Sequence, residues 1–171
     1  MHRVDEVMRK DVVSCHLEDS LNTAARIMWE QDCGCVPVVD DLRRVVGIIT
    51  DRDITMAAYI QGGGLNDTAV GAVCSRDVKT CAINDSLSRA EQIMAEAQVR
   101  RLPVVESDET LVGIISLSDL AHHLTFVAGS ESNSLGPRNL SLVLEAVSQP
   151  RHVPWQAGRD ISQPSKAVLL G

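Results

Sequence analysis

Two short segments of the sequence place a hydroxyl side chain three residues before a carboxylate: Thr50 before Asp53, and Ser116 before Asp119. This spacing is typical of a capping box, in which both side chains bind backbone N–H groups at the start of a helix. The same helix start also attracts an anion, because its free N–H groups and its dipole favour negative charge. A carboxylate beside it can accept hydrogen bonds from a vicinal diol, and phosphate together with a ribose diol describes a nucleotide. Helix capping and nucleotide binding are both open interpretations of these motifs.

Both motifs belong to a longer internal repeat. Residues 47–53 read Gly-Ile-Ile-Thr-Asp-Arg-Asp, and residues 113–119 read Gly-Ile-Ile-Ser-Leu-Ser-Asp. Around them, residues 4–54 align with residues 70–120 without a gap. A duplicated unit predicts two similar halves with pseudo-twofold symmetry and a pair of equivalent clefts.

Hydrophobic periodicity predicts the order α–β–α–β–β–α in each repeat. A short amphipathic lead and a brief strand come first, then a capped helix, a hairpin of two apolar strands and a last helix that begins at the hydroxyl residue of the motif. In the first repeat these segments are 4–8, 12–14, 21–28, 36–39, 45–49 and 50–60, and in the second they are 70–74, 78–80, 87–97, 102–105, 111–115 and 116–124.

The repeats set the expected domain boundaries. We expect the first repeat at residues 1–61 and the second at 70–125, joined by a linker at 62–69 that is rich in glycine and follows a helix end. Residues 126–171 form a tail that is either partly flexible or packed against a partner, with one short helix predicted at residues 140–147.

The set of motifs resembles a tandem pair of CBS domains, the module named after cystathionine beta-synthase. The resemblance rests on Asp-Ser-Leu before a helix, a Pro-Val-Val strand and the Gly-Ile-Ile-[Thr/Ser]-x-x-Asp turn, each present twice within residues 4–124. It implies an α/β (α+β) fold of two tandem β-α-β-β-α repeats packed with pseudo-twofold symmetry. It also implies a regulatory module, often a homodimer, whose clefts bind an adenine nucleotide such as AMP, ADP or ATP and signal to a partner protein.

The resemblance also implies roles for individual residues. Asp53 and Asp119 would hold ribose hydroxyls, while Thr50 and Ser116 would line the ribose or phosphate edge. The second repeat matches the AMP sites of the AMP-activated protein kinase gamma subunit better, because it has two arginines where the first repeat has Gly34 and Cys35. The residues carried over for nucleotide binding are Asp119, Ser116, Ser118, Arg100, Arg101, Leu102 and Pro103 in the second repeat, and Asp53, Thr50, Arg52, Val36 and Pro37 in the first.

Composition excludes several other classes of protein. The formal charge of −7 and the aromatic content of 2% argue against binding of duplex or single-stranded nucleic acid. No run of eighteen apolar residues is present, so we expect no membrane span and a cytosolic protein. Neither a nucleophile–base pair nor a metal-ligand pattern is visible, so we expect no catalysis, no metal and no required cofactor, with the adenine nucleotide as a regulatory ligand.

The five cysteines leave two alternative functions open. Cys15 and Cys81 occupy equivalent positions in the repeats and fit small buried core residues. A thiol-based stress sensor would instead use Cys15, Cys33 or Cys35. The other alternative is an interaction scaffold without a ligand, in which the two motifs only cap helices.

Overall fold

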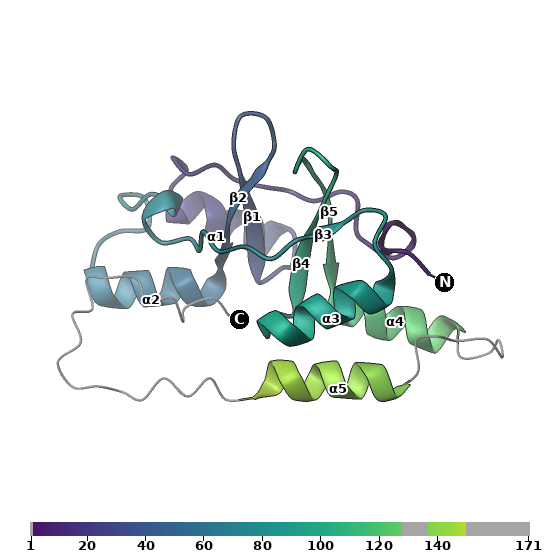
Figure 1. The fold of residues 1–171 in the computed structure, drawn as a ribbon. Coiled ribbons are helices and arrows are strands. Elements are labelled where there is room, and N and C mark those ends of the chain that lie inside the picture. The colour runs from purple at the N-terminus through teal and green to yellow at the C-terminus, as the bar shows by residue number, and fades with distance from the viewer. Residues whose placement is uncertain (1, 128–136, 150–171) are drawn as a thin grey trace. The chain divides into compact units, whose positions relative to one another are not determined.

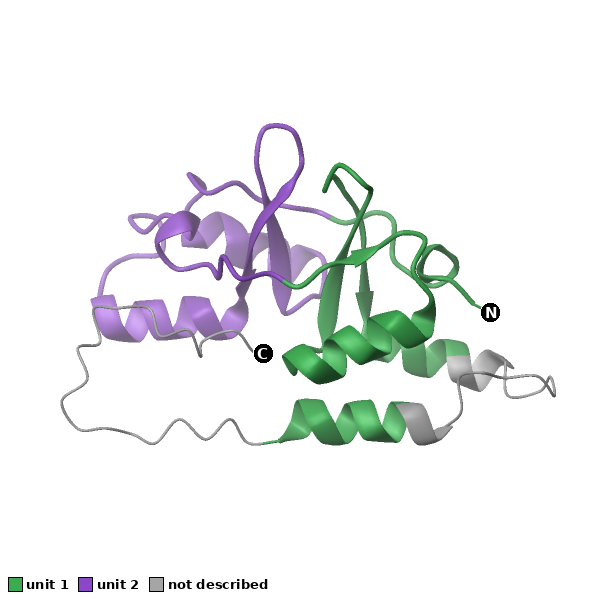
Figure 2. Cartoon of the chain, viewed as in Figure 1, with its two compact units in different colours: residues 1–12, 79–149 green, residues 13–78, 150–171 purple. Residues whose placement is uncertain are grey.

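The computed structural model describes residues 2–127 and 137–149. These residues form two compact units (Figure 2). Unit 1 combines residues 2–12 with the described residues from 79 to 149, and unit 2 consists of residues 13–78. The chain therefore passes from unit 1 to unit 2 and back again.

Unit 2 contains a two-stranded hairpin and two helices. Helix α1 (Leu21–Glu30) begins where the Ser20 hydroxyl accepts a hydrogen bond from the Thr23 amide, and it buries the apolar stripe that the sequence predicts. Strands β1 (Cys35–Val39) and β2 (Val45–Thr50) pair antiparallel, and every residue of β1 is buried. Helix α2 (Asp51–Gln61) follows β2 directly and ends at Gly62, whose φ of 61° is the left-handed conformation that glycine adopts without strain. A 3-10 turn, η2 (Val70–Ala72), completes the unit.

Unit 1 repeats this arrangement and adds one strand and one helix. Its sheet has the order β3-β4-β5, with β3 parallel to β4 and β4 antiparallel to β5. Helix α5 packs against α3 and α4 in this unit (Figure 1). Its elements are η1 (Val4–Glu6), β3 (Cys81–Ala82), α3 (Leu87–Ala97), β4 (Arg101–Val105), β5 (Leu111–Ser116), α4 (Leu117–Val127) and α5 (Pro137–Ser148).

Each unit takes its lead segment from the other repeat. The backbone of Arg9 exchanges two hydrogen bonds with Ile114 of β5, at N···O distances of 2.9 and 3.0 Å. In unit 2, Ser75 exchanges the equivalent pair of bonds with Ile48 of β2, at 2.9 and 3.0 Å. The lead of the first repeat thus completes the second repeat, and the lead of the second repeat completes the first.

Each unit has its own aliphatic core. The core of unit 2 gathers around Leu21, Val36 and Ile49, and the core of unit 1 gathers around Leu87 and Ile115. Aliphatic burial on both faces of the short hairpins supplies the main favourable free energy for each unit.

The structure confirms the other predicted helices and the hairpin strands, but it forms only a 3-10 turn in each lead and shifts the first strand of each repeat. The sequence predicts these strands at residues 12–14 and 78–80. The pairing instead lies slightly later, at a parallel bridge between Cys15 and Val38 and at strand β3. Backbone bonds from Cys15 N to Pro37 O and from Val39 N to Cys15 O fix that register.

Helix α5 covers the segment in which the sequence predicts a short helix. The rest of the predicted tail, residues 128–136 and 150–171, lies outside the described residues. Among the helices that the structure describes, none combines the length and the apolar character needed to cross a bilayer.

Candidate functional site

In unit 1, the turn from β5 into α4 holds Ser116 and Asp119 in a capping arrangement. Asp119 Oδ2 accepts hydrogen bonds from the backbone N of Ser116 at 2.9 Å and from its hydroxyl at 2.5 Å. The Ser116 hydroxyl oxygen in turn accepts a hydrogen bond from the Asp119 amide at 3.2 Å. These capping bonds use only Oδ2 of the carboxylate, and Oδ1 is directed elsewhere.

That second oxygen faces Arg9. Arg9 Nε lies 3.5 Å from Asp119 Oδ1, and the Arg9 side chain is 69% exposed whereas that of Asp119 is 13% exposed. Arg9 reaches this position because its backbone pairs with Ile114 on β5. Sequence reasoning missed this residue, because it assigned the lead to its own repeat.

Two further arginines adjoin the same turn. Arg101 stands directly opposite Ser116 in the β4–β5 ladder, which places both side chains on one face of the hairpin. The carbonyl oxygen of its neighbour, Arg100, accepts a hydrogen bond from the Leu117 amide at 2.9 Å. Arg100 and Ser118 are exposed and Arg101 is half-buried. The structure therefore brings the cationic pair that the sequence singles out to the helix start that carries Asp119.

In unit 2, Thr50 and Asp53 form the equivalent capping box. Asp53 Oδ2 accepts hydrogen bonds from the Thr50 backbone N at 2.9 Å and from the Thr50 hydroxyl at 2.7 Å. The Thr50 hydroxyl oxygen in turn accepts a hydrogen bond from the Asp53 backbone N. Asp53 is only 3% exposed, and this burial raises the pKa of its carboxyl group. The hydrogen bonds from Thr50 and the charge of exposed Arg52 act in the opposite direction, with smaller effect.

At this second turn, uncharged residues occupy the positions of the three arginines of unit 1, although Arg52 lies in the first turn of the helix that starts there. Cys35 stands opposite Thr50 in the β1–β2 ladder, where the other hairpin has Arg101. The carbonyl oxygen of Gly34 accepts a hydrogen bond from the Asp51 backbone N at 3.2 Å. The carbonyl oxygen of Arg100 accepts the equivalent bond from Leu117 in unit 1. Ser75 occupies the place of Arg9 on the edge of β2.

The apolar strand residues carried over for nucleotide binding divide into two kinds. Val36 and Leu102 have no exposed surface and belong to the cores of their units, so their side chains are committed to packing. Pro37 follows Val36 and Pro103 follows Leu102, so in each hairpin the proline lies on the face opposite to that of the core residue. Both prolines are also buried. Of the four residues, the prolines are the better candidates for contact with a base.

The thiols are placed as core groups. Burial raises the pKa of Cys15 and of Cys81 to about 12 and also raises the pKa of Cys74, which disfavours the reactive thiolate. Cys33 is half-buried, and its Sγ lies 3.3 Å from the carbonyl oxygen of Cys35. Within residues 2–127 and 137–149, no group of three His, Cys, Asp or Glu side chains is arranged to hold a metal ion.

The chain resembles known proteins over both repeats. A family model for the CBS domain matches residues 4–59 and 70–125. The CBS domain-containing protein YhcV of Bacillus subtilis (strain 168) is 36% identical over 121 residues, which make up 71% of this chain and 84% of YhcV. YhcV therefore leaves little length outside the matched pair for a further domain.

Two solved structures with bound ligands share the fold. The CBS domain pair of protein MJ0100, in complex with 5′-methylthioadenosine and S-adenosyl-L-methionine, matches with a TM-score of 0.66 and 24% identity over 77% of this chain and 99% of that chain. CBSX2 in complex with AMP matches with a TM-score of 0.67 and 21% identity over 75% of this chain and 99% of that chain. At these identities the similarity establishes the architecture.

Proposed function

The chain belongs to the CBS-domain family as a tandem pair of mixed α/β repeats, and we propose that it is a sensor that binds an adenine nucleotide. The nucleotide site is centred on the β5–α4 turn of unit 1. Asp119 accepts hydrogen bonds from the ribose hydroxyls, and Arg9, Arg100 and Arg101 contact the phosphate. The proposal includes no catalytic step and no required cofactor.

The observation that carries this proposal is the concentration of arginines around one of two otherwise equivalent turns. Both turns offer a helix start, a hydroxyl and a carboxylate. Only the turn at Asp119 adds Arg9 at 3.5 Å and Arg101 on the opposite strand. Charge-assisted bonds to phosphate are the strong contacts in such a site, so we expect the turn at Asp53 to bind more weakly or not at all.

The solved relatives support adenosine as the recognised part of the ligand. AMP in CBSX2 and S-adenosyl-L-methionine in MJ0100 share adenosine but differ in the group attached to it. Three arginines in this chain favour an anionic group in that position. We therefore place AMP, ADP or ATP ahead of S-adenosyl-L-methionine as the ligand.

Occupancy would be transmitted to a regulated protein or within a homodimer. Ligand binding rigidifies the turn between β5 and α4, and α4 also packs against α5. A change at the turn can therefore reach the surface of unit 1 through helix packing.

The test compares the two turns by calorimetry with AMP, inosine monophosphate and inorganic phosphate. Wild-type protein should bind AMP more tightly than the other two ligands, and Asp119→Ala should abolish that preference. Asp53→Ala is the matched control, because it removes the same capping bonds, at a similar stability cost of about 0.5–2 kcal/mol, from the turn that lacks counterparts of Arg9, Arg100 and Arg101. Loss of AMP binding in Asp53→Ala but not in Asp119→Ala would show that the nucleotide site lies at the turn of unit 2, and it would refute the assignment to Asp119.

Calorimetry with AMP on two arginine variants separates phosphate recognition at the site from general attraction between the anion and positive charge on the protein. Arg101→Ala should weaken AMP binding by about 1.5–3 kcal/mol, the scale of a hydrogen bond to a charged group. Arg89→Ala removes the same charge from an exposed position on α3 and should have little effect. The scaffold interpretation is supported by the capping bonds that Asp53 and Asp119 already make. It predicts no AMP binding in any of these proteins.

A further inference from the structure

The lead of the first repeat brings two histidines of unit 1 into contact. His2 in the lead and His123 on α4 lie edge to face, with ring centroids 4.6 Å apart and an angle of 73° between the ring planes. His2 Nδ1 also lies 3.2 Å from Oε2 of Glu6, four residues further along the lead. The nucleotide proposal uses none of these three side chains.

One nitrogen of this pair is enclosed without a hydrogen bond. Nε2 of His123 is buried and has no hydrogen-bond partner among the described residues. A neutral imidazole carries a proton on one ring nitrogen, whereas an imidazolium ion carries one on both. Protonation of His123 therefore places a charged donor in a buried position without an acceptor, which is the costlier of the two states.

Burial and the charge of the neighbouring ring oppose this protonation together. Burial has the largest effect and lowers the pKa of His123, a charge on His2 lowers it further, and the Glu6 carboxylate acts in the opposite direction. The lead thus supplies a carboxylate for one imidazolium ion, that of His2, and none for a second.

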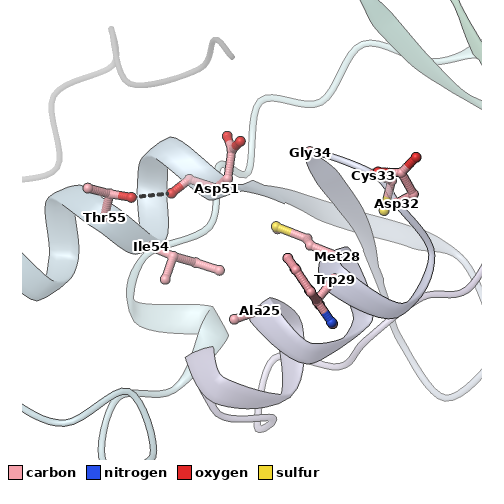
Figure 3. A pocket seen from close by; sticks show the side chains of 9 residues that line it. All are labelled: Ala25, Met28, Trp29, Asp32, Cys33, Gly34, Asp51, Ile54 and Thr55. Carbon is pink, nitrogen blue, oxygen red and sulfur yellow. Dashed lines mark hydrogen bonds between the residues drawn. The ribbon is translucent and has the colours of Figure 1, made fainter.

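The elements packed around α4 do not compensate a second charge. Among the described residues, no charged group outside the lead acts on the pKa of His123. Helix α5 packs against α3 and α4, but its Glu145 is exposed, and the pKa of Glu91 on α3 is raised by burial alone. The helix pair of unit 2 has no such cover and leaves an open hollow of about 490 Å³ lined by residues that include Ala25 and Ile54 (Figure 3).

Unit 2 makes the same backbone contact with its lead but lacks the titratable side chains. The carbonyl oxygen of Thr68 accepts a hydrogen bond from the Leu21 amide, as that of His2 does from the Leu87 amide. Alignment of the repeats places uncharged residues at all three positions: Thr68 for His2, Ala72 for Glu6 and Ala57 for His123. Docking of a lead therefore does not require a histidine pair, and the pair gives unit 1 a property that unit 2 lacks.

The lead also connects the histidine pair to the proposed nucleotide site. Its 3-10 turn is closed by a hydrogen bond from the Met8 amide to the Val4 carbonyl oxygen at 2.9 Å, and these two side chains are 8% and 0% exposed in the core of unit 1. Arg9 follows directly and reaches Asp119. A change in how the lead is seated at His2 is therefore carried through this turn to Arg9.

We propose that His2 and His123 form a proton-sensitive latch that controls the docking of the lead on unit 1 and, through Arg9, the binding of AMP. With His123 neutral, the lead is closed and Arg9 lies at Asp119. With both rings protonated, two adjacent cations and a buried donor without an acceptor favour an open lead, which removes Arg9 from the site. The effect on AMP rests on the proposed function, whereas the latch itself does not.

The direction and size of the effect follow from the titration of His123. Its pKa in the closed lead lies below the ordinary value of 6.5, so the closed state loses stability as pH falls below 6.5. At about one pH unit below that value, a histidine that is protonated only in the open state raises the open population about tenfold.

Hydrogen exchange measured by NMR on the full-length chain tests the latch, with protection expressed relative to the intrinsic exchange rate at each pH. The amides of Arg9 and Ile114 bond to each other's carbonyl oxygens and should lose about tenfold in protection between about pH 7.5 and about pH 5.5. The amides of Ser75 and Ile48 form the equivalent pair in unit 2 and should keep their protection.

Two substitutions at the ring assign the effect to His123. His123→Gln is uncharged at every pH, so it should abolish the pH dependence at Arg9. His123→Ala is the second variant, because the equivalent Ala57 is accommodated in unit 2 at 7% exposure. His122→Gln is the matched control, since His122 is exposed on the same helix, and it should keep the behaviour of the wild type. An equal loss of protection in both units, or a loss that persists in both His123 variants, would overturn the latch.

Calorimetry with AMP at the same two pH values tests the connection to Arg9. The phosphate of AMP itself titrates at about pH 6, so wild type is compared with His123→Gln. Affinity should fall further in the wild type than in the variant, by up to about tenfold. Equal falls would overturn the connection to Arg9. A chain that binds no AMP but loses protection only at Arg9 and Ile114 would refute the nucleotide proposal and support the latch.

Discussion

Replacing Glu91 by methionine should stabilise the protein at neutral pH. Glu91 lies on α3 and is only 3% exposed, and its Oε1 has no hydrogen-bond partner among the described residues. Helix α3 packs against α5, and the side chain of Gln98, which caps the end of α3, donates a hydrogen bond to the Ala146 carbonyl oxygen. The equivalent residue in the first repeat is Ala25, which lines an open hollow and buries no charge.

The size of the effect follows from the unsatisfied oxygen. A buried polar group without a partner costs about 1–3 kcal/mol, and methionine removes that group while retaining a side chain of similar length. We therefore expect Glu91→Met to raise the free energy of unfolding by about 1–3 kcal/mol at neutral pH. Glu91→Gln should give a smaller gain, because it removes the charge but leaves a polar group buried.

The stability that Glu91→Met gains over the wild type should increase as pH rises. Burial raises the pKa of Glu91 above its ordinary value of 4.5, so the folded state keeps this proton at pH values where the unfolded state has lost it. The free energy of unfolding of the wild type consequently falls as pH rises from 4.5 through the folded pKa. Glu91→Met lacks this loss, so its advantage should be largest at neutral pH and smallest below pH 4.5.

Urea unfolding at several pH values tests this reasoning, with an unchanged m-value as the sign that the compactness of both states is preserved. Glu96→Met is the matched control, since Glu96 is exposed on the same helix. A loss of stability in Glu91→Met at neutral pH would refute the argument. So would a gain that is the same at every pH, or one that Glu96→Met reproduces.

Two further predictions concern the contact of the lead with β5 and the buried thiols. An alanine Cβ at Gly113 would lie 2.8 Å from the Arg9 carbonyl oxygen, so Gly113→Ala should cost about 1–3 kcal/mol in thermal or urea unfolding and weaken AMP binding by displacing Arg9. Gly47→Ala is the control, since its nearest contacts are 3.1 Å; an equal cost in both variants would count against the argument. Cys15 and Cys81 should react slowly with a thiol reagent in the folded protein and quickly in denaturant, because burial raises their pKa to about 12. Fast reaction of both in the folded state would favour a redox sensor.

Local chemistry explains why much of the fold could be predicted from the sequence. Ser20 caps α1, and the apolar run in β1 is buried at every position. Gly62 ends α2 in the left-handed conformation that the linker composition indicates. Each of these features depends on residues close together in the chain, so periodicity and capping rules are sufficient to find them.

The exchange of lead segments could not be predicted in this way. The bonds between Arg9 and Ile114, and between Ser75 and Ile48, join distant segments through backbone groups that every residue carries. No side-chain pattern in either lead distinguishes pairing with its own repeat from pairing with the other. For the same reason, no pattern in the sequence indicates that Arg9 lies beside Asp119, although the alignment of the repeats places Ser75 at the equivalent position in the other unit.

Capping and ligand binding are compatible in this structure, although the sequence alone presents them as alternatives. The capping bonds of Asp119 use Oδ2, which leaves Oδ1 directed toward Arg9 and available to accept further hydrogen bonds. Asp53 also caps its helix through Oδ2, but its carboxyl group is more deeply buried and has a raised pKa. The two repeats therefore share the bonds that hold the turn and differ in the charges around it. An anionic ligand should distinguish them through those charges rather than through the motif that they have in common.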